Sequence, residues 1–115
     1  MATGTIKTGT AEIAYLTDVT SGVSTYGRVV KDPTTSTVRI FVIARSNSDM
    51  TMNTVLARIP EGFRPKQNEA LYGSFVVGAS SIASTYYAVV DTSGYVKQGL
   101  SGTLRAVFLT GEYAV

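Results

Sequence analysis

The sequence has no helical periodicity, and this constrains the fold more than any other feature. β-branched and aromatic residues recur from end to end in short runs, separated by Ser, Thr, Gly, Asn and Asp. Such runs favour strands, because branched and aromatic side chains pack well on a pleated sheet. Seven or eight runs occur at the spacing typical of sandwiches and barrels. The sequence therefore predicts an all-β fold, a single compact antiparallel β-barrel or sandwich of about seven or eight strands.

Turn residues divide the predicted strands from one another. Asp91 begins the four-residue link DTSG, whose Gly94 can adopt positive φ, so a hairpin is predicted there. The polar stretch Ser46 to Asn53 is predicted to be a loop, and Gly73 and Gly78 suggest bulges or close packing. The predicted strands lie within Glu12–Leu16, Thr25–Lys31, Val38–Arg45, Thr54–Ile59, Glu69–Ser80, the two halves of Ser84–Gln98, and Thr103–Val115.

The length and composition predict one domain covering residues 1–115, made in the cytoplasm and without membrane insertion. The chain has neither cysteine nor histidine, so disulfides and the commonest general base and metal ligand are excluded. Lys and Arg are scattered rather than clustered, which argues against a nucleic-acid partner. The many apolar positions exceed what one small core hides, and this predicts a homo-oligomer.

Catalysis without histidine would require paired carboxylates. Glu12, Glu69 and Glu112 lie in strand-like runs, but nothing in the sequence brings them together. A calcium site could use Asn47, Asp49 and Asn53, although the charge there is low and a solvated loop explains the same residues. We therefore predict no enzyme activity, no catalytic residues, no metal and no cofactor, while a two-carboxylate glycan hydrolase stays as the least favoured alternative.

Tyrosine and arginine are the residue types that suggest a ligand. Sugars are bound by aromatic faces and by planar hydrogen-bonding groups, and the chain has seven tyrosines and six arginines. Tyr86 and Tyr87 point to opposite faces of their strand, whereas Tyr26 and Arg28 share one face. Arg39 and Phe41 likewise share a face of the next strand. For any one tyrosine, an ordinary strand residue with a solvated hydroxyl is an equally good interpretation.

The segment RIPEGFRPKQ, followed by VVDTSGYV, resembles the C-terminal head domains of tailed-phage receptor-binding proteins, which are well represented among phages of lactococci. The likeness covers Arg58 to Val115. It is carried by Ile59, Pro60, Phe63, Pro65, Ser93, Gly94, Gly111 and Tyr113.

The resemblance implies a β-barrel head that is a homotrimer at a baseplate or tail-fibre tip of the virion, excised from a longer protein with an N-terminal neck or shoulder. Its implied partners are a host cell-wall or surface saccharide, bound without cleavage, and other baseplate or tail proteins. The alternative is a structural tail-fibre or baseplate trimerisation module without a receptor site of its own.

The pocket of that family commonly uses a His-x-Asp pair and a tryptophan, and this sequence has neither at the matching strand TYYAVVDTSG. Tyr87 stands where the histidine would lie and is the first candidate for a saccharide contact. The other candidates are Tyr86, Tyr95, Gln98 and Arg105.

The proline pair of the same segment is predicted to form a structural corner. Pro60 and Pro65 should end one strand and delay the next, because proline lacks an amide donor and fixes φ. Gly62 allows the reversal between them, and Phe63 is expected to anchor the corner in the core. Arg64 and Lys66 are expected to project outward, where a binding role is the less favoured interpretation.

Overall fold

The computed structural model describes the backbone of residues 11–77, 81–99 and 104–115, and the side chains of these residues apart from 49, 76, 77, 81–86 and 104. This part of the chain contains eight strands and no helix, so it also contains no helix that could cross a membrane. The strands are β1 (Glu12–Leu16), β2 (Val23–Asp32), β3 (Thr37–Met50), β4 (Val55–Arg58), β5 (Glu69–Val77), β6 (Ser81–Val90), β7 (Tyr95–Gln98) and β8 (Leu104–Ala114).

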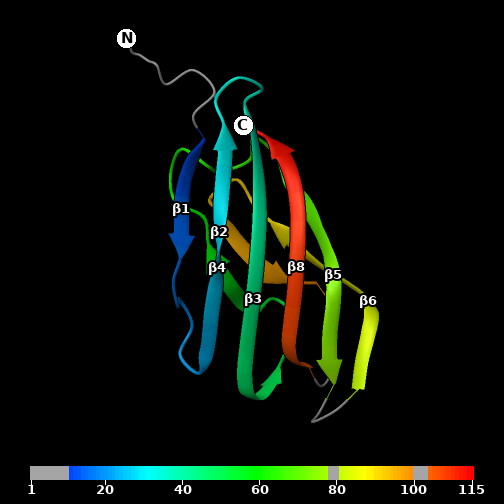
Figure 1. The fold of residues 1–115 in the computed structure, drawn as a ribbon. Helices are drawn as coiled ribbons and strands as arrows, with labels where there is room; N and C mark the ends of the chain where they lie inside the picture. Colours follow the sequence, from blue (N-terminus) through cyan, green and yellow to red (C-terminus); the bar gives the residue numbers. More distant parts are fainter. Residues whose placement is uncertain (1–10, 78–80, 100–103) are drawn as a thin grey trace.

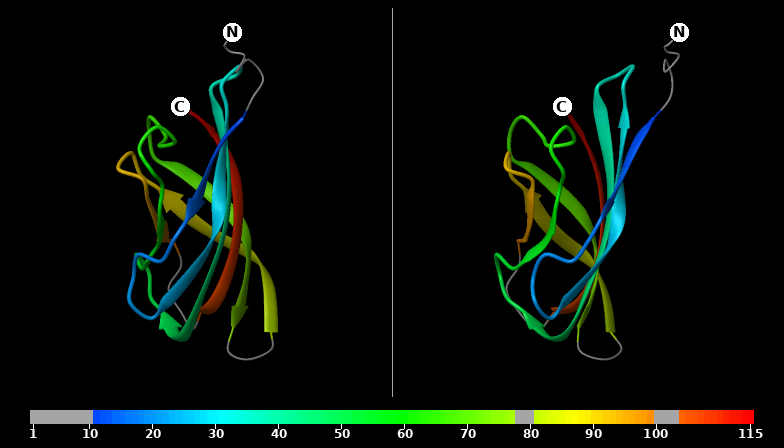
Figure 2. Two further views of the ribbon diagram at one scale, coloured as in Figure 1. Left: turned by 60° about the vertical axis from the view of Figure 1, so that its left-hand side comes forward. Right: turned by 90° about the vertical axis from the view of Figure 1, so that its left-hand side faces the viewer.

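All eight strands form one antiparallel sheet in the order β1-β2-β3-β8-β5-β6-β7-β4. β1, β2, β3 and β8 make a broad layer, β4 and β7 lie behind it, and β5 and β6 run from one layer to the other (Figures 1 and 2). The hydroxyl of Thr20 donates to the Val55 carbonyl at 2.8 Å, and the hydroxyl of Thr25 donates to the Leu56 carbonyl. These bonds bring β2 beside β4, so the sheet is nearly closed and the predicted all-β barrel is confirmed.

Alternation along the strands builds the core. On β3, Val38, Ile40, Val42 and Ala44 are buried, whereas Arg39 and Arg45 between and beyond them are exposed. Successive side chains of a strand point to opposite faces, so every second residue of each long strand enters the barrel. The other large members of this core include Val29, Leu56, Ile59, Leu71, Val90, Val96, Val107 and Leu109.

Two glycines let neighbouring backbones approach closely. A Cβ at Gly73 would overlap the Phe108 carbonyl oxygen of β8, and one at Gly27 would overlap the Phe41 carbonyl oxygen of β3. The β5 to β6 register also shifts between Gly73 and Phe75. The predicted close packing or bulge at Gly73 is therefore confirmed, whereas Gly78 lies outside the described residues.

One predicted loop is wrong over most of its length. β3 continues to Met50, which pairs with Leu104 of β8 after an irregular stretch that follows Arg45. The Met50 side chain is buried in the core. Pairing and burial by the neighbouring strand thus hold Ser46 to Met50 in a strand despite the polar local sequence.

The segment between β4 and β5 turns at its proline pair. Gly62 has a φ of +94°, and the Phe63 amide donates to the Pro60 carbonyl at 3.1 Å. Phe63 packs against the core, and Pro65 is buried. The Tyr113 hydroxyl of β8 donates to the Phe63 carbonyl at 2.7 Å, which fastens this corner to the last strand.

Arg64 differs from the expectation that it projects outward. Its side chain is half-buried, and its Nε donates to the Ile59 carbonyl at 2.8 Å. The same Ile59 donates its amide to the Gly94 carbonyl at 2.7 Å, and a Cβ at Gly94 would crowd the Arg64 side chain. Arg64 therefore joins the corner to the β6–β7 hairpin, because the polar backbone atoms there need a partner.

Candidate functional site

The outer face of the broad layer carries most of the exposed aromatic side chains. Antiparallel register places residues from successive strands directly opposite one another, with their side chains on the same face. Tyr15 of β1 pairs with Arg28 of β2, which pairs with Phe41 of β3. Phe41 pairs with Thr110 of β8, which pairs with Tyr72 of β5. We call these five residues the mixed row, because aromatic and hydrogen-bonding side chains alternate in it.

The two ends of the mixed row are its most exposed aromatic residues. Tyr15 is 74% exposed and Tyr72 is 67% exposed, whereas Phe41 at the centre is half-buried. Arg28 is also exposed, and among the described residues its guanidinium has neither an ion pair nor a hydrogen bond. The row therefore offers aromatic faces and unused donors to a ligand.

An open cleft of about 500 Å³ lies along the middle of this row. Arg39 and Glu112 form one side of it, with 3.6 Å between the arginine Nε and a carboxylate oxygen, and both side chains are exposed. An exposed pair of this kind contributes little to stability, so its groups are available for other contacts. The lining residues are Arg28, Val30, Arg39, Ile40, Phe41, Thr110, Gly111 and Glu112.

A second row next to the mixed row is more apolar. Tyr26 of β2 pairs with Ile43 of β3, which pairs with Phe108 of β8. Tyr26 is 70% exposed and the other two are partly exposed. We call these three residues the apolar row. It lies two residues along each strand from the mixed row, at a distance of about 7 Å.

The sequence-predicted candidate Tyr87 lies beside the mixed row. It pairs with Tyr72 and is 39% exposed, and its ring lies against Gly99, where any Cβ would overlap the ring. The backbone of Tyr86 pairs with Gly73, but the Tyr86 side chain is outside the described part of the structure.

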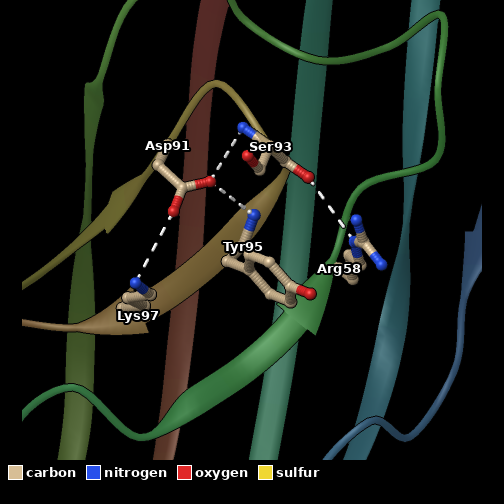
Figure 3. A network of polar contacts seen from close by, with 5 residues as sticks. All are labelled: Arg58, Asp91, Ser93, Tyr95 and Lys97. Carbon is tan, nitrogen blue, oxygen red and sulfur yellow. Dashed lines mark hydrogen bonds and ion pairs between the residues drawn. The ribbon is translucent and has the colours of Figure 1, made fainter.

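Tyr95 lies on the far layer in a polar network with its neighbours (Figure 3). The Arg58 guanidinium carbon lies 4.5 Å from the centre of its ring, and the Lys97 Nζ lies 5.9 Å from the same point. Lys97 also pairs with Asp91 at 3.6 Å. The same Asp91 accepts bonds from the amides of Ser93 and Tyr95 at 3.0 Å each. The Tyr95 ring therefore makes a cation–π contact with Arg58 of β4 and helps to hold the β6–β7 hairpin in place.

The remaining two candidates lie elsewhere. Gln98 is 1% exposed, and its Nε2 donates to the Met50 carbonyl at 2.6 Å, so its side chain belongs to the core. Arg105 donates from Nη1 to the Asn47 carbonyl at 3.1 Å near the start of β8. The structure therefore does not gather Tyr87, Tyr95, Gln98 and Arg105 into one site.

The three glutamates considered for catalysis do not share a face. Glu12 pairs in register with Lys31, which pairs with Val38 of the core face. Glu112 pairs with Arg39 on the outer face, three strands away, which is about 14 Å. Glu69 pairs with Val90 of the core face, and its carboxylate raises the pKa of the Tyr113 phenol. Within the described residues no three acidic side chains form a group that could hold a metal.

Sequence reasoning missed every member of the mixed row. The alternation of β2 and β3 did indicate that Tyr26 and Arg28 share a face, and that Phe41 and Arg39 do so too. What the sequence did not contain is the register that brings Arg28, Phe41 and Thr110 opposite one another. No protein-family model matches this sequence, and no curated protein is significantly similar to it.

Proposed function

We propose that this chain is the receptor-binding head of a tailed-bacteriophage adhesin, which binds host cell-surface saccharide without cleaving it and acts as a homotrimer on the virion. The observation that carries the proposal is the mixed row with its cleft. Aromatic faces stack on the C–H surfaces of sugars, and Arg28 and Thr110 offer donors to sugar hydroxyls. The cleft volume of about 500 Å³ suits a small group of sugar residues.

The apolar row supports self-association. Large apolar side chains exposed together on a sheet face are typical of surfaces that contact another protein. Three copies that meet through Tyr26, Ile43 and Phe108 would leave the neighbouring mixed row at the rim between protomers. This arrangement agrees with the trimer implied by the resemblance to phage heads, and it leaves one row for assembly and the other for the ligand.

The second candidate function is a structural trimerisation module without a receptor site. The apolar row favours it, because Tyr26 and Phe108 need only a second copy of the chain to become covered. The two functions differ in one measurable property, which is binding to envelope saccharide by the assembled protein.

The test measures binding of the purified protein to intact host cells and to their isolated envelope polysaccharide. Dissociation constants in the millimolar to micromolar range are expected, equivalent to about 4 to 8 kcal/mol. Arg28→Gln should weaken binding about tenfold. Arg45→Gln is the matched control, because Arg45 is an exposed arginine on the same face but off the row.

Sedimentation of the same samples separates the two candidates. Tyr26→Ala should shift the trimer towards monomer at micromolar concentration, whereas Arg28→Gln should leave the trimer intact. A trimer that labels no envelope would support the structural module. Equal losses from Arg28→Gln and Arg45→Gln would remove the mixed row as the site.

A further inference from the structure

Aromatic and hydrogen-bonding side chains alternate regularly along the mixed row, and a compact ligand in the cleft would contact only its middle part. Across the strands β1, β2, β3, β8 and β5 the row reads Tyr15, Arg28, Phe41, Thr110 and Tyr72. Over these five strands the aromatic residues stand on every second strand, and one hydrogen-bonding side chain stands on each strand between them. The register then continues to Tyr87 of β6, whose ring lies against Gly99.

The strand spacing sets the distances along the row. Neighbouring strands lie about 4.8 Å apart, so successive aromatic residues are about 10 Å apart and the two ends are about 19 Å apart. Tyr15 and Tyr72 at these ends are also the most exposed aromatic members. A single sugar, or a terminal disaccharide, that occupies the cleft around Phe41 cannot reach both ends.

A linear saccharide matches this repeat. In an extended β-linked chain, alternate residues present the same face to one side, and each residue advances by roughly one strand spacing. Aromatic rings on every second strand would then stack on alternate sugars, while the hydroxyls between them face Arg28 and Thr110. β5 curves towards the second layer (Figure 2), so the last sugars would follow the side of the barrel.

We infer that the ligand of the mixed row is a linear saccharide chain that lies across the strands and contacts Tyr15, Phe41 and Tyr72 as three successive stacking positions. The row spans about four or five sugar residues. This inference rests on the proposed saccharide-binding function and adds the class of ligand, its direction and its length. A second copy of the chain fits the row less well, because it would cover Arg28, which has no ion pair or hydrogen bond among the described residues.

The experiment measures binding against ligand length. The probes are cello- and chito-oligosaccharides of two to six residues, and size-fractionated oligosaccharides from the envelope polysaccharide that the protein binds. Affinity should rise with each added residue up to about four or five and then level off. Tyr15→Ala and Tyr72→Ala should each weaken binding of the long oligosaccharides about three- to tenfold and weaken disaccharide binding less.

Two controls protect the interpretation. The conservative variants Tyr15→Phe and Tyr72→Phe keep the ring and should retain most of the length dependence. Tyr26→Ala removes an equally exposed tyrosine outside the row and should not alter the length dependence in whatever oligomer it forms. Urea midpoints of the Tyr15 and Tyr72 variants should match the parent, since both side chains are mostly exposed.

The outcomes are distinguishable. Disaccharides that bind as tightly as longer chains, with only Phe41→Ala reducing affinity, would overturn the linear ligand and leave the proposed function standing. Dissociation of the trimer by Tyr15→Ala or Tyr72→Ala would make the row a protein interface and overturn the inference. Absence of binding to every oligosaccharide and to the envelope polysaccharide would overturn the proposed function as well.

Discussion

The Tyr113 phenol connects the last strand to the proline corner, and its removal gives a sharp test of how the barrel is held together. The side chain is 4% exposed, and its hydroxyl donates to the Phe63 carbonyl at 2.7 Å. Tyr113→Phe keeps the ring but leaves that carbonyl without this donor. The free energy of unfolding near pH 8 should fall by about 1 to 2 kcal/mol. Urea denaturation at fixed protein concentration, followed by circular dichroism, measures it.

The same substitution should change the response to alkali. Burial raises the pKa of the Tyr113 phenol above its ordinary value of 10.0, and the Glu69 carboxylate raises it further. Because the folded-state pKa is the higher one, the stabilisation is fully present below about pH 10 and is lost as the pH rises towards the folded-state value. Each pH unit in that window should lower the free energy of unfolding by about 1.4 kcal/mol.

Tyr113→Phe lacks this ionisable group, so its stability should fall less steeply above pH 10. The difference between parent and variant should shrink from about 1 to 2 kcal/mol at pH 8 to near zero around pH 11. Tyr72→Phe is the control, because the Tyr72 side chain is 67% exposed and its removal should change little at either pH. A difference that stays constant from pH 8 to pH 11 would refute the reasoning.

Three further substitutions test other parts of the fold by the same urea measurement. Gly73→Ala should lower the free energy of unfolding by more than about 2 kcal/mol, because the new methyl would overlap the Phe108 carbonyl; a loss below about 1 kcal/mol would contradict that close approach. Asp91→Ala should lower the free energy of unfolding by about 1 to 2 kcal/mol, since the carboxylate accepts hydrogen bonds from two backbone amides. Lys97→Gln removes only a partly exposed ion pair and should lower it by less than about 1 kcal/mol. Equal losses from the two substitutions would argue against the role of Asp91 in the hairpin. Thr25→Val should cost about 1 kcal/mol by removing a hydroxyl that links β2 to β4, and no change would show that this link does not help to close the barrel.

The strand pattern could be read from the sequence where local chemistry and burial agree. β1 has the predicted bounds, and the Asp91 to Gly94 link forms the predicted hairpin, with the Gly94 amide donating to the Asp91 carbonyl at 2.9 Å. The alternation of β3 showed which residues share a face, but both faces are partly apolar and the sequence did not single out the buried one. Gln98 was offered by the sequence as a saccharide contact, but it follows the buried Val96 by two residues, so the period of β7 turns its side chain into the core.

Pairing between distant strands decided the rest. The mostly polar segment Ser46 to Met50 is held in β3 by pairing at its two ends, Ser46 with Val23 of β2 and Met50 with Leu104 of β8. Arg64 turns inward because the hairpin tip lies against the corner. The mixed row depends on register in the same way. A register shift of one residue in any of its strands would move that strand's side chain in the row from the outer face to the core face.

The sequence by itself determined that the chain forms antiparallel strands, which residues alternate on each, and where its turns and proline corner fall, because these depend on side-chain shape and backbone torsions within a few residues. The tertiary structure alone decided which faces meet across β1, β2, β3, β8 and β5. That choice depends on burying every second residue in one nearly closed barrel, and it is what places Tyr15, Phe41 and Tyr72 in line on the surface.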